Sequence, residues 1–188
     1  MKNILERRKG FSRRTKRVPV NLVLEFGNKV GGNGHTTRIL IVENSADDLL
    51  LIQRELRRGK ISHVHECVGT WKFFVQAIAE FRPDLILSDH DLPGINGLDA
   101  LKFAQQHCPE VPFIFVTGAL GEELAIQTLT GGATDYVLKN RMSRLVPAVQ
   151  RALKESDGLR QRRKAELEVI LEKAVLHLKV LWRKHEAF

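Results

Sequence analysis

Six polar side chains follow short apolar runs, where folding could gather them into one reactive site. In chain order they are Glu43, Asn44, Asp89, Asp91, Thr117 and Lys139. Asp89 is the clearest case, because only Ser88 separates it from the apolar run 85–87 and the turn signal Pro93-Gly94 follows shortly after. Neighbouring carboxylates repel one another, and a hard divalent cation such as Mg²⁺ relieves that repulsion by taking oxygen ligands.

The chemistry that suits such a group is phosphoryl transfer. An Asp carboxylate can act as the nucleophile, as it does in enzymes that form an aspartyl phosphate. The transferred oxygens then need cations and donors around them, and Mg²⁺, the Lys139 ammonium and the Thr117 hydroxyl would supply these. The product adds charge and acceptor oxygens, which can draw a hydroxyl-bearing loop inward.

The elements needed to gather these residues alternate along the chain. Apolar, β-branched runs predict five strands, at 38–42, 64–68, 84–88, 111–116 and 135–138. Amphipathic segments predict helices near 45–59, 70–81, 97–107 and 122–130, and a last one from Ser143. This order predicts an α/β fold, a doubly wound five-stranded parallel sheet with helices on both faces. Right-handed crossovers bring the carboxyl ends of all five strands to one rim.

Five motifs, in order and at strand ends, resemble the receiver domain of the bacterial two-component response-regulator family. They are Ile39-Leu40-Ile41-Val42-Glu43, Asp84-Leu85-Ile86-Leu87-Ser88-Asp89, Leu92-Pro93-Gly94-Ile95-Asn96-Gly97, Val116-Thr117-Gly118, and Gly132-Ala133-Thr134-Asp135-Tyr136-Val137-Leu138-Lys139. The similarity covers about 38–153 and implies the flavodoxin-like receiver fold.

The resemblance also implies a role for each motif residue. Asp89 matches the phosphoacceptor, which takes its phosphoryl group from a histidine of a sensor kinase or a phosphotransfer protein. The metal set that it implies comprises Glu43, Asn44 and Asp89, with the backbone carbonyl of Asp91. Thr117 and Lys139 match the phosphate-binding hydroxyl and cation, and Tyr136 matches the aromatic that swings inward on phosphorylation. The downstream protein partner is not specified by the sequence.

One departure from the family pattern leaves an alternative open. Asn44 stands where the family usually has an Asp that binds the metal, and an amide oxygen carries no charge. We therefore expect weaker Mg²⁺ binding, with Asp47 or Asp48 as possible compensation from the following helix. The alternative is a pseudo-receiver, a protein-interaction module that works without phosphorylation.

An enzyme is a further alternative that the residues bring up. Asp89-His90-Asp91 has the Asp-x-Asp form of haloacid-dehalogenase-like phosphatases. That motif usually follows the first strand and carries a Thr or Val where this chain has Pro93. We therefore expect a signalling module rather than an enzyme.

The excess positive charge lies at the two ends of the chain. The net charge is +8, yet 38–150 holds 11 basic and 14 acidic residues, whereas 1–37 holds nine basic and two acidic ones. We expect a basic, flexible arm over 1–37, a receiver domain over 38–155 and a helical extension over 156–188. A basic arm can bind nucleic acid, but a solvated tail is the favoured reading.

The extension carries a heptad-like apolar stripe, at Leu167, Leu171, Ala174, Leu178 and Leu181. It predicts a homodimer through this helix, a signalling linker, or a face that packs back on the domain. No apolar run is long enough to cross a bilayer, and two cysteines suggest neither a disulfide framework nor a zinc site. We expect a cytoplasmic protein.

Overall fold

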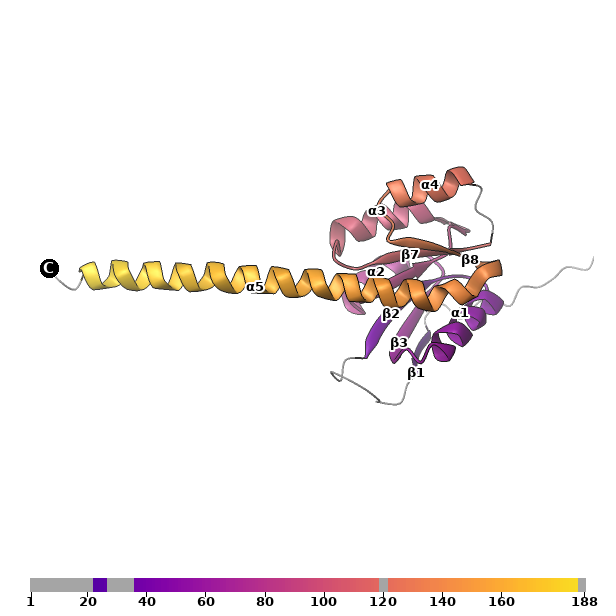
Figure 1. The fold of residues 1–188 in the computed structure, drawn as a ribbon. Coiled ribbons are helices and arrows are strands. Elements are labelled where there is room, and N and C mark those ends of the chain that lie inside the picture. The colour runs from indigo at the N-terminus through magenta and orange to yellow at the C-terminus, as the bar shows by residue number, and fades with distance from the viewer. Residues whose placement is uncertain (1–21, 27–35, 119–121, 186–188) are drawn as a thin grey trace, which may run out of the picture.

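The computed structural model describes residues 22–26, 36–118 and 122–185. Its centre is a six-stranded sheet (Figure 1). The strand order is β1-β3-β2-β4-β7-β8, in which β1 is antiparallel to β3 and the other neighbours are parallel. The strands are β1 Leu22–Phe26, β2 Thr37–Val42, β3 His63–Val68, β4 Leu85–Ser88, β7 Phe113–Thr117 and β8 Asp135–Leu138. The predicted five-stranded parallel sheet is confirmed.

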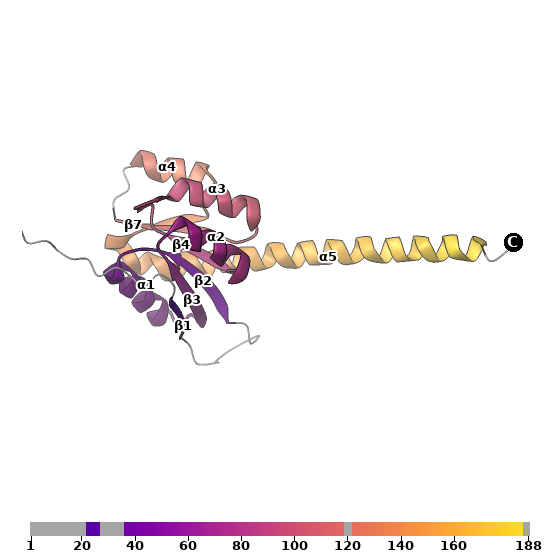
Figure 2. The same ribbon diagram turned by 180° about the vertical axis from the view of Figure 1, so that it is seen from behind.

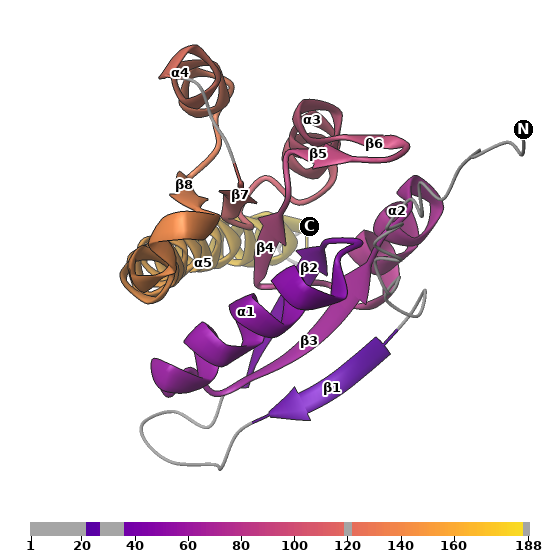
Figure 3. The same cartoon turned by 90° about the vertical axis from the view of Figure 1, so that its right-hand side faces the viewer.

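Helices cover both faces of this sheet, as Figure 3 shows along its edge. They are α1 Ala46–Arg58, α2 Trp71–Glu80, α3 Gly97–His107, α4 Glu122–Thr130 and α5 Leu145–His185, with a 3₁₀ turn at Lys139–Arg144 before α5. A small hairpin of β5 Asp91–Leu92 and β6 Ile95–Asn96 follows β4. The doubly wound arrangement expected from the alternation of elements is therefore present.

The alternation of side chains along β2 divides the core into two halves. Ile39 and Ile41 pack in the cluster that includes α1 and α5, whereas Leu40 and Val42 pack in the cluster that includes α2 and α3. All four are fully buried, because successive strand residues point to opposite faces and both faces are covered. This explains why the central strands are continuous apolar runs.

Strand β1 lies in the stretch that the sequence assigns to the N-terminal arm. An alternating pattern predicts a short strand within 18–26, and Leu22–Phe26 forms one that pairs with β3. It lies at the outer edge in Figure 3. The physical reason is that β3 would otherwise be an edge strand, whose free backbone groups accept a further strand. The rest of 1–35 lies outside the described residues.

Helix α5 begins in the core and ends far outside it (Figures 1 and 2). Its first turns contribute Leu145, Val149 and Ala152 to the core, and Ser156 is its last buried residue among those whose side chains are described. The last helix and the extension that the sequence predicts are one continuous helix of 41 residues.

The projecting part of α5 exposes several large apolar side chains between its charged residues. Its exposed large hydrophobic side chains are Leu159, Leu167, Val169, Ile170, Leu171, Val175, Leu176 and Leu178. No helix in the described ranges is both long and apolar enough to cross a membrane, because charged residues interrupt α5 throughout.

Candidate functional site

Residues from four neighbouring strand ends and one helix form an acidic site at the carboxyl edge of the sheet. Glu43 follows β2, Asp89 follows β4, Thr117 ends β7 and Lys139 follows β8. Asp48 joins them from the first turn of α1. The parallel order β2-β4-β7-β8 places these strand ends side by side, which is where open α/β sheets bind ligands.

The Lys139 ammonium links three carboxylates. Its Nζ lies 2.8 Å from Glu43 Oε2, 2.7 Å from Asp48 Oδ2 and 2.7 Å from Asp89 Oδ2. Burial by itself would lower the pKa of Lys139, but hydrogen bonds to Asp48, Asp89 and Glu43 outweigh it and raise the pKa above its ordinary value. The ammonium therefore stays charged and neutralises part of the negative cluster.

Glu43 is the buried member of the cluster, with 1% of its surface exposed. Its Oε1 accepts hydrogen bonds of 2.8 Å from the backbone N–H groups of Asn44 and Ser45. Burial raises the pKa of Glu43, and the opposing bonds to Lys139 and the backbone do not cancel that effect. The side chain is thus held rigidly by its own loop on one oxygen and by Lys139 on the other.

Asp48 reaches the site because of how α1 begins. Ser45 is the N-cap, and its Oγ accepts a 3.3 Å hydrogen bond from the backbone N–H of Asp48. This cap places Asp48 on the first turn, next to the end of β2. The sequence offered Asp48 only as a substitute for Asn44, because helix position alone does not say that its carboxylate reaches across to Lys139.

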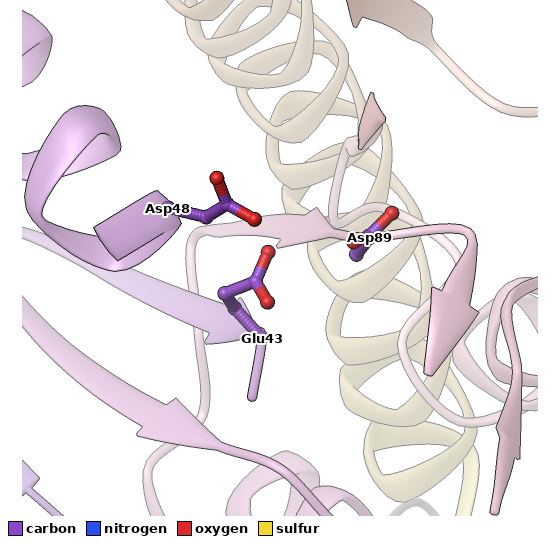
Figure 4. Close-up of side chains that lie close together, drawn as sticks. All are labelled: Glu43, Asp48 and Asp89. Atoms are coloured by element: carbon purple, nitrogen blue, oxygen red, sulfur yellow. The ribbon is translucent and has the colours of Figure 1, made fainter. Parts of the chain in front are cut away.

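Three carboxylates converge as Figure 4 shows, from the ends of β2 and β4 and from α1. One oxygen each of Glu43, Asp48 and Asp89 can be chosen so that all lie within 4.8 Å of one another. Hard carboxylate oxygens at this spacing are the donor set that Mg²⁺ prefers. The residues present therefore fit a magnesium ion, with Glu43, Asp48 and Asp89 as the side chains that would hold it.

The remaining predicted metal residues lie differently. Asn44 is half-buried, and its backbone N–H donates a hydrogen bond to Glu43 Oε1. The side chain of Asp91 is 82% exposed and its Oδ1 lies 3.0 Å from His90 Nδ1. The carboxylate of Asp91 is thus turned to solvent, which is compatible with the backbone role expected of this residue.

Thr117 and Tyr136 occupy the neighbouring strands. Thr117 is buried at the end of β7, next to Leu138 in the β7–β8 register. Tyr136 lies in β8 opposite Phe115, half-buried against the core cluster on the α2–α3 side. Both residues therefore lie in the two strands that follow β4, and with it Asp89, in the order β4-β7-β8.

Known proteins with the same pattern were found by sequence and by structure. The family model described as the response regulator receiver domain matches residues 39–150. The LuxO regulatory protein of Vibrio cholerae serotype O1 is 32% identical over 94 residues, which cover 50% of this chain and 21% of LuxO. The regulatory protein AtoC of Escherichia coli K12 is 31% identical over 118 residues, which cover 62% of this chain and 25% of AtoC.

A solved structure extends the similarity to the fold. The CheY-like response regulator receiver domain protein of Methanospirillum hungatei superposes with a TM-score of 0.58 at 26% identity, covering 66% of this chain and 98% of that one. This chain spans about a quarter or less of the length of LuxO and AtoC. Because the family model covers more than half of it, the chain belongs to the response regulator receiver-domain family of two-component signalling.

Proposed function

We propose that Asp89 accepts a phosphoryl group from a histidine of a sensor kinase or a phosphotransfer protein, in a Mg²⁺-dependent reaction. The observation that carries this proposal is the contact of Lys139 Nζ with Glu43, Asp48 and Asp89. It brings one nucleophilic carboxylate, two further acids and a permanent cation to one point. Signalling of this kind takes place in the cytoplasm, where we place the protein.

The residues of the chain account for each part of the transfer. An Asp89 oxygen forms the new P–O bond while the P–N bond to the donor histidine breaks, and the imidazole nitrogen keeps the electron pair of that bond. The Lys139 ammonium and the Thr117 hydroxyl would donate to phosphoryl oxygens. Mg²⁺, when bound by the carboxylates, supplies further charge neutralisation at those oxygens.

The consequence of transfer is a change at the neighbouring strands. Phosphorylation replaces one negative oxygen of Asp89 by a dianionic group with three acceptors. Thr117 moves towards that group, and Tyr136 turns inward on β8, so that the surface formed by α4, β8 and α5 binds a different protein partner. The chain is on this view a signalling module without turnover of its own.

The pseudo-receiver alternative rests on Asn44 alone. Asp48 weakens it, because its carboxylate restores a third acid to the cluster within reach of Glu43 and Asp89. A working phosphoacceptor site is therefore the better-supported reading.

Incubation with acetyl phosphate, with and without Mg²⁺, tests the proposal directly. We expect the intact mass to rise by one phosphoryl group in the wild type with Mg²⁺, but not in Asp89→Ala. Asp99→Ala, which removes an exposed acid of α3, is the matched control and should behave as wild type. If wild type gains no phosphoryl group from acetyl phosphate or from a histidine kinase, the pseudo-receiver reading replaces this one.

A turnover assay separates the signalling reading from the enzyme reading. We expect no sustained hydrolysis of p-nitrophenyl phosphate by the wild type beyond that of Asp89→Ala. Multiple turnovers that are lost in Asp89→Ala would instead support a phosphatase.

The exposed stripe on α5 supports a second partner, another copy of this chain. Leu167, Leu171 and Leu178 lie at heptad spacing on the projecting helix and are all more than half exposed. In a parallel pair in register, Arg163 at a g position of one helix would lie near Glu168 at an e position of the other, and their opposite charges attract. We propose a weak parallel dimer, because the stripe from Leu167 to Leu178 spans fewer than two heptads.

A further inference from the structure

A cavity of about 740 Å³ lies at the end of the sheet opposite Asp89. Its walls come from the start of β2, from α2 and the turn after it, from α3 and from α5. Helices α2 and α5 pack on opposite faces of the sheet, as Figure 3 shows, and residues of both reach the cavity at its end. The volume falls in the range of small-molecule sites, and the proposed phosphorylation chemistry does not use this end of the molecule.

Three arginines and one aspartate give the cavity a positive excess. Arg38, Arg82 and Arg160 line it together with Asp84. The buried Asp84 carboxylate accepts a 2.9 Å bond from the Arg38 backbone N–H and lies 3.5 Å from the guanidinium groups of Arg38 and of Arg160. Asp84 thereby orients two guanidinium groups. Asp157 lies 4.0 Å from Arg160 as a second acid, so three cations face two carboxylates and a positive excess remains.

Arg82 stands in a backbone conformation that normally favours glycine. Its φ is +51°, and its N–H bonds to Ala77 O at the end of α2. Helices often end in such a left-handed residue, usually Gly, because a side chain there is strained. Here the residue is an arginine that lines the cavity and has no ion pair with any residue that the structure describes.

The rest of the lining is mostly apolar, with His107 and Cys108 as its other members. Val75 and Ile78 of α2 face Phe103 of α3 and Val111 of the following loop. Phe103 packs edge-on against Phe74 and stacks on His107. A ligand bound here would have both guanidinium groups and an aliphatic and aromatic wall within the same lining.

We infer that this cavity binds a small organic anion with an aromatic or apolar body, its phosphate, sulfonate or carboxylate group lying between Arg82 and Arg160. Guanidinium groups pair with such oxyanions through paired N–H donors. An apolar body is required as well. The wall formed by Val75, Ile78 and Phe103 favours binding only when the ligand covers it and removes apolar surface from water. Occupation would tie the end of α2 to α5 at the point where α5 leaves the domain.

Titration with naphthalene-2-sulfonate tests the inference, because this probe has the required chemistry and cannot donate a phosphoryl group. We expect saturable shifts of the backbone amide signals of Val75, Phe103 and Val111 in NMR spectra. Naphthalene-2-methanol lacks the charge and inorganic sulfate lacks the apolar body, so each should bind at least about ten-fold more weakly. The Asp89→Ala variant should bind the sulfonate as wild type does.

The decisive variant is Arg82→Gly, with Lys60→Gly as its matched control. Lys60 follows α1 with a φ of +53° and does not line the cavity, so both changes relieve the same backbone strain. Each should raise Tm by about 3 °C, but only Arg82→Gly should weaken sulfonate binding, by about ten-fold. Equal binding in the two variants, shifts elsewhere on the protein, or no saturation by about 10 mM probe would each overturn the inference.

Discussion

Lys139 Nζ lies 2.7 Å from Asp89 Oδ2, although 50 residues separate the two in the chain. The same ammonium also contacts Glu43 and Asp48, so a single cation holds three acids together at the edge of the sheet. Removal of any one of these four side chains should therefore change both the stability and the chemistry of the site.

Replacement of Lys139 by Met should destabilise the protein at neutral pH in metal-free buffer. The three carboxylates would lose their common partner, and Glu43 is buried. We expect the free energy of unfolding to fall by about 2 kcal/mol, less than for a wholly buried pair, since Asp48 is partly exposed. Urea unfolding measures this, and added Mg²⁺ should restore more stability to the variant than to wild type. An unchanged midpoint in metal-free buffer would contradict the contribution assigned to Lys139.

Removing an acid from the site and adding one to it should change the Mg²⁺ affinity in opposite directions. Asp48→Asn removes a carboxylate from the cluster and should weaken Mg²⁺ binding about ten-fold, whereas Asn44→Asp adds a charge next to Glu43 and should strengthen it. Isothermal titration calorimetry on both variants checks this. Asp47→Asn, one residue before Asp48 but outside the cluster, serves as the control. A larger loss in Asp47→Asn than in Asp48→Asn would show that the assigned acid is the wrong one.

Stability should decrease between pH 6.5 and pH 4 because of His65. Burial, then the charges of His63 and Arg57, lower the pKa of His65 from 6.5 to about 4. Gln53 Nε2, 3.0 Å away, can only donate, so His65 Nε2 must accept and the neutral ring is favoured. The unfolded chain binds the proton first as pH falls, so up to about 3 kcal/mol of stability is lost across this window.

Urea unfolding at several pH values from 7 to 4 tests this dependence. In His65→Gln, the free energy of unfolding should change with pH about half as steeply or less between pH 6.5 and 4. His177→Gln, which changes an exposed histidine of α5, should leave it unchanged. The assignment to His65 fails if the two variants show the same slope as wild type.

The projecting part of α5 should contact the α5 of a second copy of the chain through one face only. Leu171 and Leu176 are equally exposed, at 64% and 63%, but only Leu171 lies on the heptad stripe with Leu167 and Leu178. Leu171→Lys should therefore weaken the proposed dimer about ten-fold or more, whereas Leu176→Lys should leave it nearly unchanged. Sedimentation equilibrium at several concentrations checks this, and a monomer at every concentration would remove the dimer proposal.

The sequence by itself determined the order of the elements and the edge of the sheet at which the site lies. Runs such as 85–87 are apolar without interruption because both faces of their strand are covered. Asp89, Thr117 and Lys139 each follow or end such a run, so the alternation of elements alone places them at one edge. Asp89 and Lys139 do meet there.

Tertiary structure decided which side chains meet at that edge and which do not. Asp48 joins the cluster, whereas the carboxylate of Asp91 turns to solvent, because these directions depend on a helix cap and a hairpin rather than on residue type. The basic cavity unites Arg38, Arg82 and Arg160 from three distant segments. No local pattern encodes such a meeting, since it arises only when α5 packs across the sheet and brings Arg160 to Asp84.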